Sequence, residues 1–333
     1  MARKTVTVRN DVPRVDTEGN ILDAHEPCLE RFEGCFYFYG SAFDGHTGWT
    51  PDNTVNCYSS EDLEAWQAHG PLVPPGHLVA PCVRFNQRTG RYVLWHVARG
   101  GYGVYTAEEP AGPFELVVKG PRLRFGEDQQ MGNGDFTLFV DEDRTCYLVY
   151  TVVERQSQDP TSRHQIYIER LTGDYLEGTG EVSDRLAWNC EAPAMFTTGG
   201  TYYVLFDNTC CWCAAGTGCR VYTAEAPLGP YTYRGDINRT ADPDPRRIES
   251  NAHDTEPGDG RADVIIPMQS RRIAQLPTPG GTEFILIGDR WQSTPDGVKG
   301  HDYTYWTSPL KFAEDGMIER LGWEDHWTVE IEL

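Results

Sequence analysis

The apolar positions of this chain gather in short segments that are separated by turn residues. Five of these segments share one form: a short strand, a turn rich in Gly, Asp or Asn, and a second strand dominated by aromatic and β-branched residues. They begin at Glu26, Ala80, Gly134, Glu191 and Gln269. Each pattern is typical of a β-hairpin, and the apolar second strand is expected to be buried.

The hairpins recur at a spacing that indicates a repeated unit. Successive starts lie 54, 54, 57 and 78 residues apart, and further strand patterns such as VNCYSSEDLEAW and CRVYTAEAPLGPY follow them. Five units of four strands, with hardly any helical period, predict an all-β fold. We expect a single five-bladed β-propeller over residues 1–333, with four antiparallel strands per blade and blades that start near 26, 80, 134, 191 and 269. A WD-type interaction propeller is disfavoured, because its Gly-His and Trp-Asp pairs are missing at the blade period.

The longest interval contains a segment without a core pattern. Residues 241–263 are rich in Pro, Gly and acidic side chains, which is typical of a solvated loop. We expect this loop on the rim of the propeller, where it would shape the pocket or hold His253 near it.

Composition excludes several classes of partner. A formal net charge of -21 would repel phosphate backbones and anionic lipid surfaces, so no nucleic acid and no membrane partner is expected. No apolar stretch is long enough for a membrane span, and a neutral substrate fits the charge better. The N-terminal sequence MARKTVTVRN lacks the apolar region of a signal peptide. The chain as written is therefore expected in the cytoplasm, or secreted if a leader has been removed.

The cysteines do not form a recognisable metal site. A chain of this length can bury its own core, so the ten cysteines are expected to be free thiols. The cluster CCWC at 210–213, with Cys219 following, suggests zinc, but no second pair of Cys or His follows at ligand spacing. We expect Cys210 and Cys211 to be unpaired, with pairing or a place in the site as alternatives. No metal and no cofactor are predicted.

Acidic residues stand at the start of three of the five hairpins. Glu26, Asp135 and Glu191 hold these positions in otherwise apolar patterns. In a propeller the first strand of each blade lines the central channel, so these starts converge at one end of the axis. The three carboxyl groups are therefore predicted to share one pocket. The alternative is that they are ordinary solvated loop carboxylates.

Several motifs in this order resemble glycoside hydrolase family 43. They are AHEPCL, DFTLFVDEDRTCYL and EAPAMFTTGGTYYVL, and the resemblance covers roughly residues 16–327. DTEGNILDAH and FILIGDRW look most like the exo-β-1,3-galactanase branch of that family. The resemblance implies an inverting mechanism with a base from the first blade, a carboxylate that modulates pKa from the third and an acid from the fourth. Matched by position, these are Glu26, Asp135 and Glu191.

The chain departs from the family pattern in two places. Most of the family has Asp-Pro where this chain has Glu26 before Pro27, and the galactanase branch has glycines there and is thought to use a glutamine that corresponds to Gln269. The base role is therefore open between Glu26 and Gln269. Val79 and Ala80 stand where that branch carries an acid in the second blade. Some relatives hold a channel cation such as calcium, but nothing in this sequence specifies its ligands.

The resemblance implies an exo-acting hydrolase that releases galactose or arabinose from a neutral, β-linked plant-type oligosaccharide or polysaccharide. The alternative is a non-catalytic carbohydrate-binding propeller derived from the family. Inversion needs a protonated acid on one side of the sugar and a base that activates water on the other. A nearby Asp135 would raise the pKa of Glu191, and Pro193 with the strand TYYVLF would limit its solvation.

Six further residues are candidates for substrate binding. His25 would contact a sugar hydroxyl or orient a carboxylate, although a lone histidine is more often a hydrogen-bonded structural residue. Gln269 would donate a substrate hydrogen bond. Arg290 would reach the acids or a hydroxyl, with a structural salt bridge as the alternative. Loop tryptophans suit sugar stacking, with ordinary packing as the alternative, and these are Trp49, Trp212 and Trp291.

Overall fold

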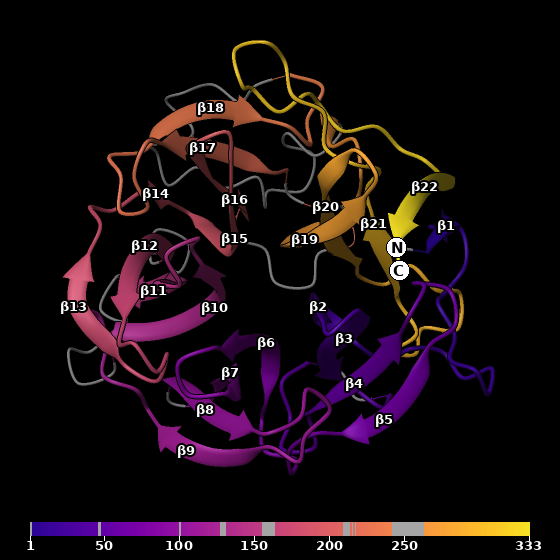
Figure 1. The fold of residues 1–333 in the computed structure, drawn as a ribbon, viewed down its shortest axis with the longest axis horizontal. Coiled ribbons are helices and arrows are strands. Elements are labelled where there is room, and N and C mark those ends of the chain that lie inside the picture. Colours follow the sequence, from indigo (N-terminus) through magenta and orange to yellow (C-terminus); the bar gives the residue numbers. More distant parts are fainter. Residues whose placement is uncertain are drawn as a thin grey trace.

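The computed structural model is a ring of five antiparallel sheets around a central axis (Figure 1). It describes residues 2–45, 48–99, 101–126, 131–154, 164–208, 214, 216, 218–241 and 263–333. These residues form strands and turns with no α-helix among them. The predicted fold class, an all-β five-bladed propeller, is confirmed. Most of the 241–263 loop, including His253, lies outside the described residues.

Each blade starts with an inner strand at the axis and continues outward. Blade 1 holds β2 (His25–Phe32), β3 (Cys35–Ala42), β4 (Thr54–Ser60) and β5 (Gln67–Pro71). Blade 2 holds β6 (Val79–Asn86), β7 (Arg91–Ala98), β8 (Gly101–Ala107) and β9 (Glu115–Lys119). Blade 3 holds β10 (Met131–Val140), β11 (Cys146–Glu154), β12 (His164–Leu171) and β13 (Gly178–Val182), and β14 (Ala187–Trp188) also pairs with β12.

The last two blades complete the ring. Blade 4 holds β15 (Cys190–Thr198), β16 (Thr201–Asn208), β17 (Arg220–Ala224) and β18 (Thr232–Asp236). Blade 5 departs from four strands, because its sheet contains only β19 (Gln269–Thr278), β20 (Gly281–Arg290) and β21 (Tyr303–Trp306). The five inner strands, β2, β6, β10, β15 and β19, start at or close to the positions that the repeat predicts.

The two ends of the chain pair with each other beside blade 5. β1 (Arg3–Arg9) and β22 (His326–Glu332) form an antiparallel two-stranded sheet that lies next to β21 in Figure 1. The Asn10 side chain then bonds both backbone groups of Trp306, accepting from its N–H at 3.0 Å and donating to its carbonyl at 3.0 Å. These bonds fasten the first and last strands to the fifth blade.

Every inner strand carries a β-bulge near its start. The register with the second strand shifts between His25 and Cys28, Val79 and Cys82, Asn133 and Phe136, Glu191 and Ala194, and Ser270 and Arg272. Three of the bulges contain a residue with left-handed φ followed by proline: φ is 51° at Glu26, 52° at Ala80 and 54° at Ala192. Proline fits because a bulge leaves one residue out of the ladder. The bulges re-aim the side chains at the start of each strand.

The hydrophobic core lies between neighbouring blades. Phe136 of blade 3 packs against Trp95 and Tyr102 of blade 2, with ring centroids 6.3 and 4.8 Å apart. Second strands supply much of this core, as their apolar pattern predicts: Phe38 and Leu286 are buried. Each fully buried side chain of this size contributes about 1.5–3 kcal/mol relative to exposure. Sheet packing therefore holds the ring of inner strands in place.

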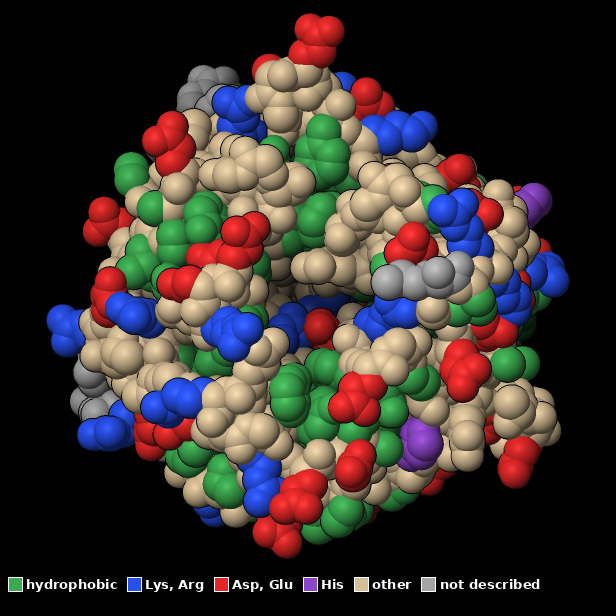
Figure 2. All heavy atoms as spheres, in the orientation of Figure 1, with side chains coloured by type: hydrophobic (Ala, Val, Ile, Leu, Met, Phe, Trp, Pro, Cys, Tyr) green, Lys and Arg blue, Asp and Glu red, His purple; other side chains and the backbone are tan. Residues whose placement is uncertain are grey.

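The face in Figure 2 is hollowed at its centre, and basic and acidic side chains lie in the hollow. Among the described residues, no helix is both long and apolar enough to span a bilayer.

Candidate active site

One buried arginine connects the starts of the inner strands. Arg271, on β19, donates from Nη1 to Asp135 Oδ2 at 2.6 Å and from Nη2 to Glu26 Oε1 at 3.1 Å. Its Nε donates to Asp289 Oδ2 at 3.3 Å, and Nη2 also donates to Gln269 Oε1 at 2.8 Å. Side chains from blades 1, 3 and 5 thus meet at a single guanidinium.

Glu26 accepts hydrogen bonds from three elements. Besides the bond from Arg271, its Oε2 accepts from Ser41 Oγ at 2.5 Å and from the backbone N–H of Ala80 at 3.0 Å. A carboxylate offers about four acceptor positions, so one remains on Oε1. Burial raises the pKa of Glu26, although the charge of Arg271 acts in the opposite direction. Glu26 is therefore a buried carboxyl group whose affinity for a proton is enhanced.

Asp289, on β20, links His25 to the same cluster. Its Oδ2 accepts the backbone N–H of Glu26 at 2.9 Å, and its Oδ1 lies 3.0 Å from His25 Nδ1. Burial alone would lower the pKa of His25, but the hydrogen bond and charge of Asp289 outweigh it and raise that pKa. His25 Nε2 has no hydrogen-bond partner within the described part of the chain.

Gln269 connects Arg271 to the carboxyl group of blade 4. Its Oε1 accepts from Arg271 and, at 2.7 Å, from Trp291 Nε1. Two donors at one atom identify that atom as the amide oxygen, so the other atom is the NH₂ group. This NH₂ donates to Glu191 Oε1 at 3.0 Å.

A lysine and an indole flank the cluster beside blade 5. Trp291 is buried and packs against His25, with ring centroids 5.2 Å apart. Lys299 Nζ lies 3.5 Å from the centroid of the Trp291 ring. Burial lowers the pKa of Lys299 to about 8, although neighbouring carboxylates raise it. The site therefore combines several buried carboxyl groups with one buried and one partly buried cation.

Comparison with known proteins identifies the family of this chain. A family model described as glycosyl hydrolases family 43 matches residues 21–278. The chain belongs to this family. An arabinoxylan arabinofuranohydrolase of Bacillus subtilis (strain 168) is 25% identical over 270 residues, which are 65% of this chain and 50% of the relative. The family 43 chain thus spans about half the length of that curated relative.

Solved structures share the fold, and two of them show the extent of the likeness. A family 43 β-1,3-galactosidase with galactodeoxynojirimycin has a TM-score of 0.74 and 22% identity, over 96% of this chain and 99% of that one. An exo-β-1,3-galactanase from Clostridium thermocellum has a TM-score of 0.76 and 19% identity, over 96% of this chain and 66% of that one. At these identities the likeness concerns the propeller fold. The resemblance of the sequence motifs to family 43 is confirmed by the family model.

The family 43 propeller brings the three predicted acids together. Glu26 and Asp135 contact one guanidinium, and Glu191 joins them through Gln269. His25 is part of the same network, with its ring buried rather than in a solvated loop.

Other predicted residues lie elsewhere or outside the described residues. Arg290 follows Asp289 on β20, so its side chain is on the opposite face, where its guanidinium lies 4.6 Å from the Trp323 ring centroid. Trp49 is 44% exposed and donates from Nε1 to the carbonyl of His77 at 2.7 Å. Trp291, in contrast, belongs to the cluster: it is buried, presents its ring to Lys299 and His25, and donates from Nε1 to Gln269. Trp212, with Cys210 and Cys211, lies outside the described residues.

The described cysteines are free thiols, as expected: Cys28, Cys35, Cys57, Cys82, Cys146, Cys190 and Cys219. Within the ranges that the structure describes, no group of three or more His, Cys, Asp or Glu side chains is arranged to hold a metal ion.

The sequence reasoning missed the residues that join the acids. Arg271 carried a signal, because it stands at the start of an inner strand at the level of the other bulges. Asp289 was visible only as the neighbour of Arg290, and strand alternation decides which of the two faces the cluster. Ser41 and Lys299 had no local signal, since they reach the site from a second strand and from a connecting segment.

Proposed function

We propose that this chain is an inverting, exo-acting glycoside hydrolase that releases galactose or arabinose from a neutral, β-linked plant-type glycan. Membership of family 43 supports glycoside hydrolysis. The observation that carries the proposal for this chain is the connected set of carboxyl groups: Arg271 joins Glu26 and Asp135, and Gln269 joins Glu191.

Glu191 is the proposed general acid. Gln269 donates to its Oε1, and Oε2 is the proposed carrier of the proton that protonates the leaving oxygen. The side chain of Glu191 is buried at the end of this hydrogen-bond network. Asp135, the more accessible acid with 16% of its side chain exposed, is the proposed modulator and orienting group.

Glu26 is the proposed general base. One acceptor position on Oε1 is left for a water molecule, while Arg271, Ser41 and Ala80 fix the orientation of the carboxylate. Gln269 is the alternative base. Its amide oxygen already accepts two hydrogen bonds and its NH₂ donates to Glu191, so no lone pair of the amide is left to accept a proton from water. This hydrogen bonding favours Glu26 and assigns Gln269 to positioning of the acid.

The sugar assignment rests on relatives and charge. The curated relative is named as an arabinofuranohydrolase, and the structural neighbours are named as a β-1,3-galactosidase and a β-1,3-galactanase. A net charge of -21 disfavours an anionic polysaccharide. His25 Nε2 is buried and lacks a hydrogen-bond partner in the described chain, and it is the proposed contact of this residue with a sugar hydroxyl.

The function is tested by sugar release and stereochemistry. Wild-type protein and Glu191→Gln are incubated with β-1,3-galactan, arabinan and a panel of aryl glycosides, and the first product is followed by proton NMR. We expect a monosaccharide of inverted anomeric configuration, and loss of about 10²–10⁴ in turnover of the natural glycan on replacement of Glu191. A product of retained configuration, or wild-type turnover in the variant, contradicts the mechanism.

The base is identified by chemical rescue. In Glu26→Ala, azide is small enough to occupy the place of the lost carboxylate and attack the sugar, so a glycosyl azide of inverted configuration is expected. Gln269→Ala should lose activity without gaining an azide product. Azide rescue of the Gln269 variant instead of the Glu26 variant would transfer the base role to Gln269.

A carbohydrate-binding protein without hydrolysis is the second candidate. Two observations favour it: both oxygens of Glu26 already accept hydrogen bonds, and blade 2 offers only Val79 and Ala80 at the level of the acids. Calorimetric binding of galacto- or arabino-oligosaccharides, with no product after prolonged incubation at high enzyme concentration, would support this function over hydrolysis.

A further inference from the structure

Blades 1 and 2 each place a cysteine directly after the proline of the inner-strand bulge. Cys28 follows Pro27 on β2, and Cys82 follows Pro81 on β6. No other inner strand has this Pro-Cys pair. The two sulfur atoms lie 3.9 Å apart and are buried, with 1% and 0% of the residues exposed. Two thiols are therefore in contact across the boundary between the blades.

Donors and cations surround this thiol pair. Arg84 Nη1 lies 3.4 Å from Cys28 Sγ, and the backbone N–H of Leu138 donates to Cys82 Sγ at 3.4 Å. Arg272 is buried, and its Nε and Nη2 have no hydrogen-bond partner among the described residues. Uncompensated positive charge of this kind stabilises a thiolate.

The environments of the two sulfurs differ. Burial opposes ionisation of Cys82, but the hydrogen bond from Cys28 and the charges of Arg84 and Arg272 outweigh it and lower the pKa of Cys82 well below its ordinary value. Burial and the partner sulfur raise the pKa of Cys28. One thiolate beside one thiol is the arrangement that reacts with an oxidant and then resolves to a disulfide.

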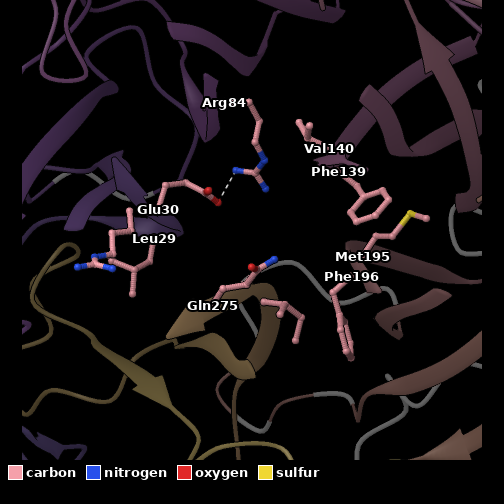
Figure 3. Close-up of a pocket in the computed structure, with 10 residues that line it drawn as sticks. Leu29, Glu30, Arg84, Phe139, Val140, Met195, Phe196 and Gln275 are labelled. Atoms are coloured by element: carbon pink, nitrogen blue, oxygen red, sulfur yellow. Dashed lines mark hydrogen bonds and ion pairs between the residues drawn. The ribbon is translucent and has the colours of Figure 1, made fainter. Parts of the chain in front are cut away.

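A cavity at the other end of the axis is separated from this pair only by the side chains of Glu30 and Arg84, which line it. It has a volume of about 190 Å³, and Glu30 and Arg84 form one side of it (Figure 3). These two side chains form an ion pair at 2.5 Å, and Cys28 Sγ contacts both, at 3.9 Å from Glu30 Oε1 and 3.4 Å from Arg84 Nη1. Residues 30 and 84 lie four positions beyond residues 26 and 80, about 13 Å further along the axis. The thiols therefore stand between the candidate active site and the cavity.

We infer that peroxide oxidises Cys28 and Cys82 to a disulfide, which joins the inner strands of blades 1 and 2. A peroxide molecule enters through the Glu30–Arg84 cavity, which is large enough for it. This modification site is separate from the proposed hydrolysis, because neither sulfur belongs to the hydrogen-bond network of Arg271.

The chemistry balances with hydrogen peroxide as the oxidant. The Cys82 thiolate attacks one oxygen, the O–O bond breaks, and hydroxide leaves and takes a proton to give water, so Cys82 becomes a sulfenic acid. Cys28 sulfur then attacks Cys82 sulfur, the S–O bond breaks, and a second water leaves with the Cys28 proton. Two thiols and one peroxide give one disulfide and two waters. The sulfurs must approach by about 2 Å to reach disulfide length.

The bond is tested by peroxide titration of the native protein. After catalase has removed the peroxide, the protein is denatured in the presence of iodoacetamide, which alkylates the remaining thiols. It is then digested with trypsin and with chymotrypsin, because chymotrypsin cleaves between Cys57 and Cys82 and so places them in separate peptides. We expect a cross-linked pair of peptides that contain residues 28 and 82 and that dithiothreitol separates. As peroxide is added, Cys82 should become inaccessible to iodoacetamide at least about tenfold faster than Cys57. Cys57 is the reference because it is a buried thiol whose pKa is raised by burial.

Matched variants separate the two steps. Cys28→Ala should lose the cross-link and leave a sulfenic acid on Cys82 that dimedone traps, whereas Cys82→Ala should leave Cys28 fully alkylated. Cys57→Ala, the control, should form the cross-link like wild type. If alanine variants do not fold, the serine variants and the wild-type peptide map give the same readout. Full alkylation of both residues after oxidation, or disulfides only among other cysteines, overturns the inference.

Discussion

Arg271 is predicted to neutralise the buried carboxyl groups of the site, and Arg271→Met tests this. In the wild-type protein its guanidinium donates to Asp135 at 2.6 Å, Glu26 at 3.1 Å and Asp289 at 3.3 Å. Methionine keeps much of the aliphatic volume but removes the charge and all the donors. Removal of one partner from a buried ion pair costs about 3–5 kcal/mol, so we expect the free energy of unfolding to fall by at least that amount at pH 7.

The cost should depend on pH, because carboxyl groups without a counter-charge take up protons. A carboxyl with an ordinary pKa of 4.5 costs about 3.4 kcal/mol to protonate at pH 7 and about 0.7 kcal/mol at pH 5. Loss of Arg271 raises the folded pKa of Glu26 further above its unfolded value. The resulting stability is present below the unfolded pKa and is lost as the pH rises through the folded pKa. The variant should therefore be about 2–3 kcal/mol less destabilised at pH 5 than at pH 7, for each carboxyl that takes up a proton.

Urea unfolding, followed by tryptophan fluorescence at pH 5, 7 and 8, measures this difference. Arg290→Met is the matched control, because that arginine lies on the adjacent strand and contacts the Trp323 ring. We expect the control to cost about 1 kcal/mol with little change between pH 5 and 8. A cost below 1 kcal/mol for Arg271→Met, or a cost that is the same at all three pH values, would refute the assignment of Arg271 as the counter-charge.

Three further predictions concern residues around the axis. Gly40→Ala should cost about 3 kcal/mol in urea unfolding, because the new Cβ would lie 2.3 Å from the carbonyl carbon of Ala24; a loss below 1 kcal/mol contradicts this. Burial raises the pKa of Glu30 to about 7, so protonation of Glu30 stabilises the folded protein. This contribution is fully present below pH 4.5 and is lost as the pH rises through 7. The free energy of unfolding of Glu30→Gln, taken relative to that of the wild type, should therefore rise by about 2–3 kcal/mol from pH 5 to pH 8. A difference between the two proteins that is the same at both pH values contradicts this prediction. Trp291→Phe should lower the free energy of unfolding by about 1–2 kcal/mol, because it removes the indole hydrogen bond to Gln269. Trp49 is 44% exposed, so Trp49→Ala should lower it by less than about 0.5 kcal/mol. Equal losses in the two variants would contradict this prediction.

The repeat and the fold were predictable because they depend on local patterns. Turn residues and apolar second strands mark each hairpin, and a Pro-containing bulge marks three of the inner strands at Glu26, Ala80 and Ala192. These signals lie within each unit and do not require knowledge of which units are neighbours. The three-stranded fifth blade was not predictable, since the β1–β22 pair that lies beside it joins segments from opposite ends of the chain.

The site was predictable only where it follows the repeat. Glu26, Asp135 and Glu191 stand near the bulges, so their convergence follows from the ring. Asp289 and Ser41 lie on second strands, and the extra residue in each inner-strand bulge changes which second-strand residues lie beside the inner-strand side chains. Without the pairing register of β19 and β20, the sequence favoured Arg290 rather than Asp289 as the side chain that faces the site. Only the folded ring shows that a single arginine is in contact with carboxyl groups from three blades.

The central claim is that Glu191 protonates the leaving oxygen. It is tested most directly by the leaving-group dependence of Glu191→Gln on aryl glycosides of the released sugar. A leaving group of low pKa needs no proton, so we expect near wild-type turnover with dinitrophenyl glycosides and a loss of about 10²–10⁴ with alkyl or sugar leaving groups. An equal loss with every leaving group would contradict the role of Glu191 as the general acid.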